Sequence, residues 1–187
     1  KPYFNAKELP YVNKQQKKIV YAGLLGLAQG IFTICKNVNF KYFEIEFHIY
    51  GNGVEKELIK KFIKENRGSN VFLHETVSKE VIQKKLLLYD ATIIPLQTYI
   101  YGAFPSKITM AMASALPIFF SGDGEGFDVV NKYNLGYVSK AGDFKSLNEN
   151  IKKFSKLDDK TLLEMKKNIM NTVKNNFNYE QQQLELF

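Results

Sequence analysis

A short segment at positions 105–107 combines residue types that suit phosphate binding. Pro105 fits the first turn of a helix, Ser106 carries a hydroxyl that can cap free N–H groups there, and Lys107 adds a cation. A helix N-terminus exposes unpaired N–H groups and the positive end of the helix dipole, which attract anions. The segment predicts a phosphate site, and the ordinary start of a packed core helix is the alternative.

Glycine-bearing loops form the second group of candidate residues. Each follows a predicted strand, and together they span 23–30, 51–53 and 121–126. Glycine permits unusual backbone angles and the close approach of a ligand. Because ligands bind outside the carboxyl ends of parallel strands, near a topological switch point, we expect these loops and the helix start at 105–107 to share one ligand edge.

Strands and helices must alternate to place those loops together, and the hydrophobic pattern predicts this alternation. Apolar or alternating runs predict strands at 17–22, 43–50, 71–73, 91–95, 118–120 and 136–138. Helices are predicted at 31–38, 54–66, 79–88, 105–115, 127–133, 144–154 and 160–175, with Ser78, Asp143 and Asp158 or Asp159 as caps. The fold class is therefore α/β, a Rossmann-like parallel sheet of about six strands with helices on both faces.

Composition indicates a globular, basic chain. Its 187 residues are 45% hydrophobic, enough for one large domain with a sizeable core. The formal charge of +7 favours anionic partners such as nucleotides, nucleic acid or an acidic membrane surface. The lysines, however, spread along helix faces, and no nucleic-acid recognition motif accompanies them. We therefore expect solvated helix faces and no nucleic-acid partner.

Several sequence features are missing. No apolar run approaches the roughly 20 residues of a membrane helix, and no signal peptide begins the chain. The single cysteine, Cys35, fits a buried thiol in a reducing cytoplasm. There is no Asp-X-Asp pair or histidine cluster for a metal. His48 and His74 lack an evident acid or nucleophile partner in the sequence, so we expect both to be structural.

Taken in order, these motifs resemble the C-terminal domain of group 1 glycosyltransferases of the GT-B fold, and more narrowly the bacterial polysaccharide and lipid-linked-sugar transferases. The resemblance covers roughly residues 17–154. The matching segments are Tyr21-Ala22-Gly23, Leu25-Gly26-Leu27-Ala28-Gln29-Gly30, Gly51-Asn52-Gly53 followed by Glu55, Tyr89-Asp90-Ala91, Ile94-Pro95-Leu96, Pro105-Ser106-Lys107, Met112-Ala113, Pro117, 121–125 and Leu135-Gly136-Tyr137-Val138. The set as a whole is more specific than any single glycine turn.

The resemblance implies a donor-nucleotide-binding domain, one half of a GT-B fold. Its substrate would be a nucleoside-diphosphate sugar of the UDP or GDP type, with no cofactor or metal and with retention of anomeric configuration. The implied donor contacts are Gly26, Gln29, Ser106 and Lys107 for the pyrophosphate, and Gly51, Asn52, Gly53, Thr76, Val77 and Met110 for base and ribose. Glu125 would contact the sugar, with a solvated charge at a helix start as the alternative. The catalytic residues stay unassigned.

This sequence departs from the family pattern at two acidic positions, where Met110 and Gly102 stand. A non-catalytic scaffold domain of the same fold is therefore an alternative, and a flavodoxin-like module is a third. We expect 1–16 to be a linker from an absent N-terminal acceptor domain, 17–178 the donor domain and 179–187 a tail. The implied protein is cytoplasmic, builds surface polysaccharide or glycolipid, and can meet a lipid-linked acceptor at the inner membrane face.

Overall fold

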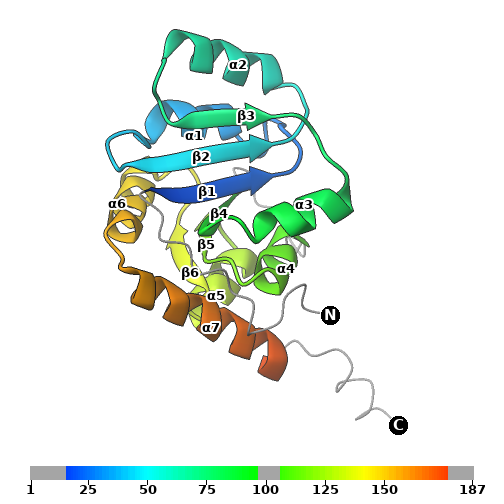
Figure 1. Cartoon of the computed structure of the whole chain (residues 1–187), viewed down its shortest axis with the longest axis vertical. Helices are drawn as coiled ribbons and strands as arrows, with labels where there is room; N and C mark the ends of the chain where they lie inside the picture. Colours follow the sequence, from blue (N-terminus) through cyan, green and yellow to red (C-terminus); the bar gives the residue numbers. More distant parts are fainter. Residues whose placement is uncertain (1–15, 97–105, 177–187) are drawn as a thin grey trace.

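Short runs of β-branched and aromatic residues form one six-stranded sheet in the computed structural model, which describes residues 16–96 and 106–176. The strands are β1 (Lys17–Ala22), β2 (Ile45–Tyr50), β3 (Val71–His74), β4 (Ala91–Pro95), β5 (Ile118–Ser121) and β6 (Gly136–Ser139). Their order is β3-β2-β1-β4-β5-β6 and every neighbouring pair is parallel (Figure 1). This confirms the predicted Rossmann-like fold, with its switch point between β1 and β4.

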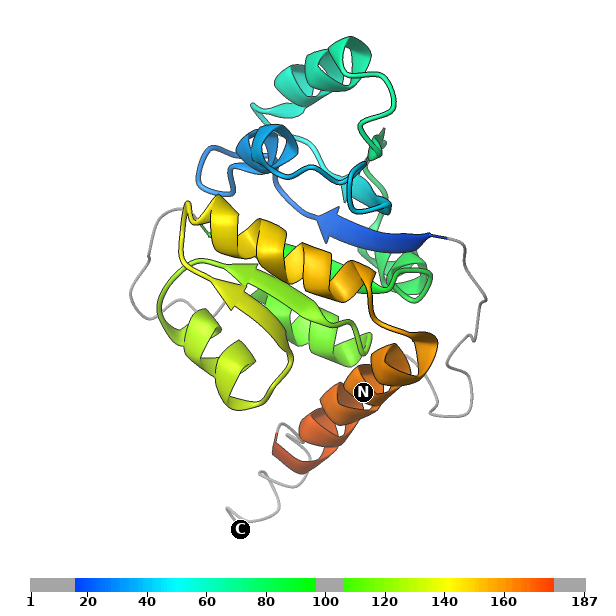
Figure 2. The same cartoon turned by 90° about the vertical axis from the view of Figure 1, so that its left-hand side faces the viewer.

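Helices cover both faces of the sheet (Figure 2). One face carries α1 (Ile31–Asn37), α2 (Lys56–Glu65) and α6 (Phe144–Ser155). The other carries α3 (Lys79–Leu86), α4 (Ser106–Ala113), α5 (Glu125–Lys132) and most of α7 (Asp159–Asn176), whose Leu162 belongs to the cluster on the first face. Within these described helices, none is long and apolar enough to cross a membrane.

The central strand β1 shows why the sheet is held from both sides. Ile19 and Tyr21 belong to one apolar cluster and Val20 to the other, and all three side chains are fully buried. Successive strand residues point to opposite faces, so a strand covered by helices on both faces needs a continuous apolar run. Each such buried side chain contributes about 1.5–3 kcal/mol relative to an exposed one.

Three of the predicted helix caps are confirmed. The Ser78 hydroxyl accepts a hydrogen bond from the backbone N–H of Val81, and the Asp143 carboxylate accepts one from Ser146 at 3.0 Å. Asp158, one of two candidates, caps α7 through the N–H of Thr161 at 2.7 Å. Cys35 is buried, as expected.

Several predicted boundaries were wrong by two residues, among them the starts of β2, α2 and α5 and the end of α4. Strand β2 begins at Ile45 instead of 43, because a turn with Glu44 at φ 54° closes through the bond from Ile45 N–H to the carbonyl of Phe40. Helix α5 begins at Glu125 instead of 127. Gly126 makes this earlier start possible, since a Cβ there would lie 2.5 Å from the ring of Phe120.

Candidate functional site

The loops that follow β1 and β2 are joined by backbone hydrogen bonds at the carboxyl edge of the sheet. The N–H of Gly23 donates to the carbonyl of Tyr50 at 2.9 Å, and that of Leu25 to Asn52 at 2.8 Å. In return, the N–H of Glu55 donates to Leu25 at 3.0 Å. The pairing of β1 with β2 therefore continues beyond the strands, and the two predicted ligand loops form one surface.

Gly51 and Gly53 make this contact between the loops possible. A Cβ on Gly51 would overlap the carbonyl oxygen of Gly23, and one on Gly53 would overlap that of Leu25. Both glycines are therefore required by the neighbouring loop. Asn52 between them is exposed, and the predicted contact of these three residues with a base or ribose stays a prediction.

Glu55 is a site residue to which sequence analysis gave no role. Its side chain is 4% exposed and accepts the N–H of Phe32, in the first turn of α1, at 3.2 Å. The second loop thereby supplies the acceptor that the start of α1 lacks, because Gly30 at the N-cap has no side chain. Burial, and then the charge of Glu55, raise the pKa of Tyr21 and of Cys35. The sequence feature that could have identified Glu55 is its position two residues after the glycine turn at 51–53.

Lys107 crosses the switch point from α4 to the first loop. Its Cε would lie 2.5 Å from a Cβ on Gly23, and its Nζ lies 5.9 Å from the ring centre of Tyr21. Burial of the half-exposed side chain lowers the pKa of Lys107. No acidic side chain within 16–96 and 106–176 forms an ion pair with it. Helix α4 therefore places a cation beside the glycine loop after β1.

Gln29 carries a buried acceptor with no partner among the described residues. Its side-chain oxygen, Oε1, is shielded from solvent and has no hydrogen bond there. The same atom would lie 2.7 Å from a Cβ on Gly26, so the glycine makes room for the amide. A buried unpaired carbonyl oxygen is costly and needs a donor. The first loop thus contains an acceptor without a partner and lies against the Lys107 cation of α4.

The other predicted site residues lie at the same edge or behind it. Ser106 is the first described residue of α4, and its carbonyl accepts the Thr109 hydroxyl at 2.7 Å. Its predicted cap has no counterpart among the described bonds. Met110 and Val77 pack against the apolar cluster on the α4 side. Thr76 is exposed, and Glu125 is exposed in the first turn of α5. Tyr99, Tyr101, Gly102 and Pro105 fall outside the described residues.

His48 has an acid partner, which corrects the sequence-based expectation. Its Nε2 lies 2.9 Å from the carboxylate of Glu46, and its Nδ1 lies 2.8 Å from Nε2 of His74. Glu46 and His48 are two residues apart on one strand, so their side chains share a face. That spacing was the available signal. Among the described residues, no group of three His, Cys, Asp or Glu side chains suits a metal.

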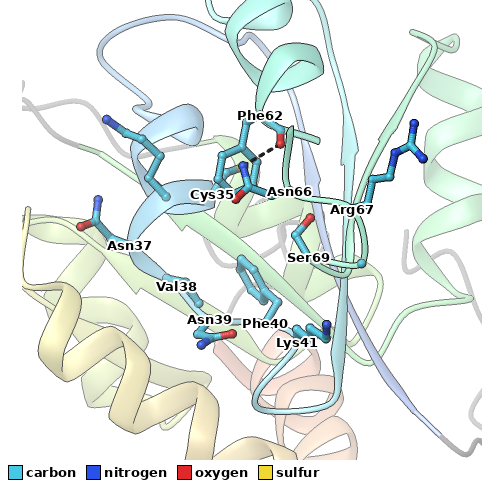
Figure 3. Close-up of a pocket in the computed structure, with 12 residues that line it drawn as sticks. Cys35, Asn37, Val38, Asn39, Phe40, Lys41, Phe62, Asn66, Arg67 and Ser69 are labelled. Atoms are coloured by element: carbon cyan, nitrogen blue, oxygen red, sulfur yellow. Dashed lines mark hydrogen bonds between the residues drawn. The ribbon is translucent and has the colours of Figure 1, made fainter. Parts of the chain in front are cut away.

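A hollow of about 360 Å³ lies at the opposite edge of the sheet (Figure 3). It is lined by the ends of α1 and α2 and by the turns that follow them, including Lys36 in the last turn of α1, and Lys41 and Arg67 in the turns. Helices α1 and α2 end here, and cations are the ordinary complement to the negative end of a helix dipole. The hollow is therefore separate from the loops at the carboxyl edge.

Comparison with protein families gives one match over most of the chain. Residues 6–172 match the family model described as "Glycosyl transferases group 1". Comparison with curated protein sequences finds no match.

Solved structures share the fold. The C-terminal domain of LpcC, a group 1 family glycosyl transferase from Francisella tularensis, is 12% identical with a TM-score of 0.70, covering 93% of this chain and 98% of that one. A TarM variant from S. aureus, crystallised with fondaparinux, alpha-GlcNAc-glycerol and UDP, is 23% identical with a TM-score of 0.69, covering 89% and 34%. WaaG, a glycosyltransferase involved in lipopolysaccharide biosynthesis, is 14% identical with a TM-score of 0.66, covering 87% and 44%. This chain thus spans about a third of the TarM length.

Proposed function

Because this chain belongs to the group 1 glycosyl transferases, we propose that it is the donor-binding domain of a retaining glycosyltransferase. The donor is a nucleoside-diphosphate sugar of the UDP or GDP type. One observation carries this proposal: Lys107 lies against the first glycine loop at the switch point, half-buried and without an ion pair among the described residues. The UDP in the TarM variant is consistent with it.

The reaction explains why a cation is needed there. The nucleoside diphosphate leaves the sugar with added negative charge, and fixed dipoles or cations near that charge lower the barrier. Lys107 and the N–H groups at the start of α4 supply both. Partial burial weakens solvent screening, so the cation acts more strongly on the phosphate than an exposed lysine would.

Gln29, in the same loop, supports the same assignment. Its buried Oε1 needs a hydrogen-bond donor, and a sugar or ribose hydroxyl supplies one. The doubly esterified diphosphate of a nucleotide sugar is fully ionised at neutral pH, so its phosphate groups offer only acceptors. The loop therefore suits a ligand that carries both phosphate and hydroxyl groups, as a nucleotide sugar does.

The proposed role of the full protein is based on its family and on the net charge of this chain. The full protein would add an acceptor-binding domain and build surface polysaccharide or glycolipid in the cytoplasm. A formal charge of +7 favours contact with an anionic membrane surface, where a lipid-linked acceptor would lie.

A scaffold domain of the same fold is the second candidate, and Met110 favours it. The methionine packs into the apolar cluster, where the resemblance implies a ribose-binding glutamate. Met110→Glu separates the two candidates. A donor site that still binds nucleotide gains affinity from a ribose contact, whereas a scaffold domain loses stability and gains no binding.

Calorimetric titration with UDP, GDP and ADP tests the proposal on the 187-residue chain. Lys107→Ala should weaken binding of the preferred diphosphate about 10- to 100-fold, since a charge-assisted bond contributes about 1.5–3 kcal/mol. Lys132→Ala is the matched control, because Lys132 also lies over an aromatic ring, 5.2 Å from the centre of Tyr133, but at the end of α5. No binding at millimolar concentration, or equal losses in both variants, would contradict the proposal.

A further inference from the structure

Four polar side chains form a continuous chain across β1, β2 and β3. Lys18 Nζ lies 3.0 Å from the Glu46 carboxylate, and the same carboxylate oxygen lies 2.9 Å from His48 Nε2. His48 Nδ1 in turn lies 2.8 Å from His74 Nε2. The chain begins at a partly exposed cation, Lys18, and ends at the last residue of β3, at the carboxyl edge where the candidate ligand loops lie.

Hydrogen-bond chemistry fixes the direction of this chain. A carboxylate only accepts, so His48 must donate from Nε2 to Glu46. Neutral imidazole carries one proton, which leaves Nδ1 of His48 as an acceptor for the Nε2–H of His74. His74 then carries its lone pair on Nδ1. The Glu46 charge thus sets the tautomer of a histidine two hydrogen bonds away.

The surroundings keep both rings neutral and in place. Burial, outweighing the bond and charge of Glu46, lowers the pKa of His48. Burial, then the charges of His48 and Lys85, lower the pKa of His74. Ring contacts hold the geometry: His74 stacks on Tyr50 at 4.4 Å between centres, while His48 stacks on Phe72 at 4.9 Å.

His74 remains open to a ligand. It is partly exposed, and no described residue forms a hydrogen bond with its Nδ1. Strand β3 stands three places from β4 in the sheet, so His74 lies roughly 10–15 Å across the edge from the switch point. An extended nucleotide whose phosphates meet Lys107 reaches that far with its base.

We propose that His74 is a specificity-determining residue that accepts a ring N–H of the donor base through Nδ1. This inference rests on the proposed function and narrows it. Uracil carries a ring N–H at N3 and guanine at N1, whereas cytosine and adenine present lone pairs at the equivalent positions. The chain therefore selects uridine or guanosine diphosphates over cytidine and adenosine diphosphates.

Titration of the full chain with UDP, CDP, GDP and ADP tests the selection. UDP should bind about tenfold more tightly than CDP, or GDP more tightly than ADP, because a mismatched base sets two acceptors against each other. His74→Gln keeps the amide donor toward His48 but removes the Nδ1 acceptor, and should abolish the preference. His74→Asn places an oxygen near the Nδ1 position and should retain part of it. Ser69→Ala, before β3 at the other edge, is the control.

Nitrogen-15 NMR of the imidazoles tests the chain without nucleotide. The Nε2–H tautomer is expected at both histidines, and Glu46→Gln should lower its population. Glu57→Gln, which removes the partner of Lys60, is the control and should leave this population unchanged. An Nδ1–H tautomer at His74 overturns the inference. So does an equal affinity for UDP and CDP combined with an equal affinity for GDP and ADP. If no nucleotide binds at all, the proposed function fails, and a fixed tautomer then shows a purely structural chain.

Discussion

The side chain of Lys107 rests on Gly23, so closely that a Cβ on the glycine would lie 2.5 Å from Cε of the lysine. The two residues come from opposite sides of the switch point, one from α4 and one from the loop after β1. A glycine is therefore needed at position 23 for the lysine to reach the first loop. This pair connects the backbone of the loop to the charge that the proposed function requires.

Gly23→Ala should displace Lys107 and weaken diphosphate binding about tenfold. Gly142→Ala is the matched control, because Gly142 also has a positive φ, +74°, but a Cβ there meets nothing within 4 Å. Both variants strain the backbone by about 1 kcal/mol, and only the first moves the lysine. Urea unfolding measures the loss of stability that both variants share. Calorimetry measures the loss of diphosphate affinity, which is expected only in Gly23→Ala. Equal binding by the two variants would refute the role of this contact.

Gly51→Ala should destabilise the fold by about 2 kcal/mol or more, because the new Cβ overlaps the carbonyl oxygen of Gly23. The angle φ of Gly51 is not in the left-handed region, so the loss reports steric overlap alone. Urea denaturation measures it. A change below about 0.5 kcal/mol, the range of ordinary surface substitutions, would mean that the two loops separate easily.

Lys107 should give binding and stability opposite pH dependences. Burial lowers its pKa from the ordinary 10.5, so the folded chain loses this proton before the unfolded chain does. As pH rises from the pKa of Lys107 in the folded chain to its pKa in the unfolded chain, this group increases the free energy of unfolding. Diphosphate affinity falls over the same interval, because the cation is lost. Lys107→Arg should remove that alkaline decline, and an unchanged decline would assign it to another group.

The two histidines should make the fold sensitive to mild acid. Both have a pKa below the ordinary 6.5, so the unfolded chain binds more protons as pH falls. Their contribution to stability is present above about pH 6.5 and is lost below it. Glu46, whose pKa is also lowered because bonds from His48 and Lys18 outweigh burial, adds a separate loss below its ordinary 4.5. In the wild-type chain the urea concentration at the unfolding midpoint should fall as pH is lowered from 7 to 5. This dependence on pH should be weaker in His48→Gln.

Glu44→Gly should stabilise the fold by about 0.5–1 kcal/mol. Glu44 is exposed and has φ 54°, a left-handed angle that costs a residue with a Cβ about 1–2 kcal/mol. Glycine removes that cost but loses more backbone freedom on folding, which leaves the smaller net gain. Thermal unfolding measures it, with Glu44→Ala as the control that keeps the Cβ. Equal melting temperatures for the two variants would contradict this account.

The fold could be predicted because it depends on local patterns of residue types. The candidate site could be predicted only in part, because it also depends on contacts between residues far apart in the sequence. Residue types alone identified Ser78 and Asp143 as caps, since each hydrogen bond spans only three residues. The edge shared by Gly23 and Gly51 followed from parallel strand order. In contrast, the hydrogen bond between His48 and His74 depends on the register of β2 against β3, and the contact of Glu55 with α1 depends on the path of two loops. The hydrophobic periodicity of the sequence specifies neither the strand register nor the path of the loops.

The backbone bonds from Gly23 to Tyr50 and from Leu25 to Asn52 have a consequence for the entropy of binding. They order the two loops before any ligand arrives. Fixing a residue from a flexible loop costs about 1–2 kcal/mol of conformational entropy, which free loops would lose at the moment of association. Here that cost falls on folding instead. A nucleotide therefore meets a preorganised surface, and more of its contact energy remains available as affinity.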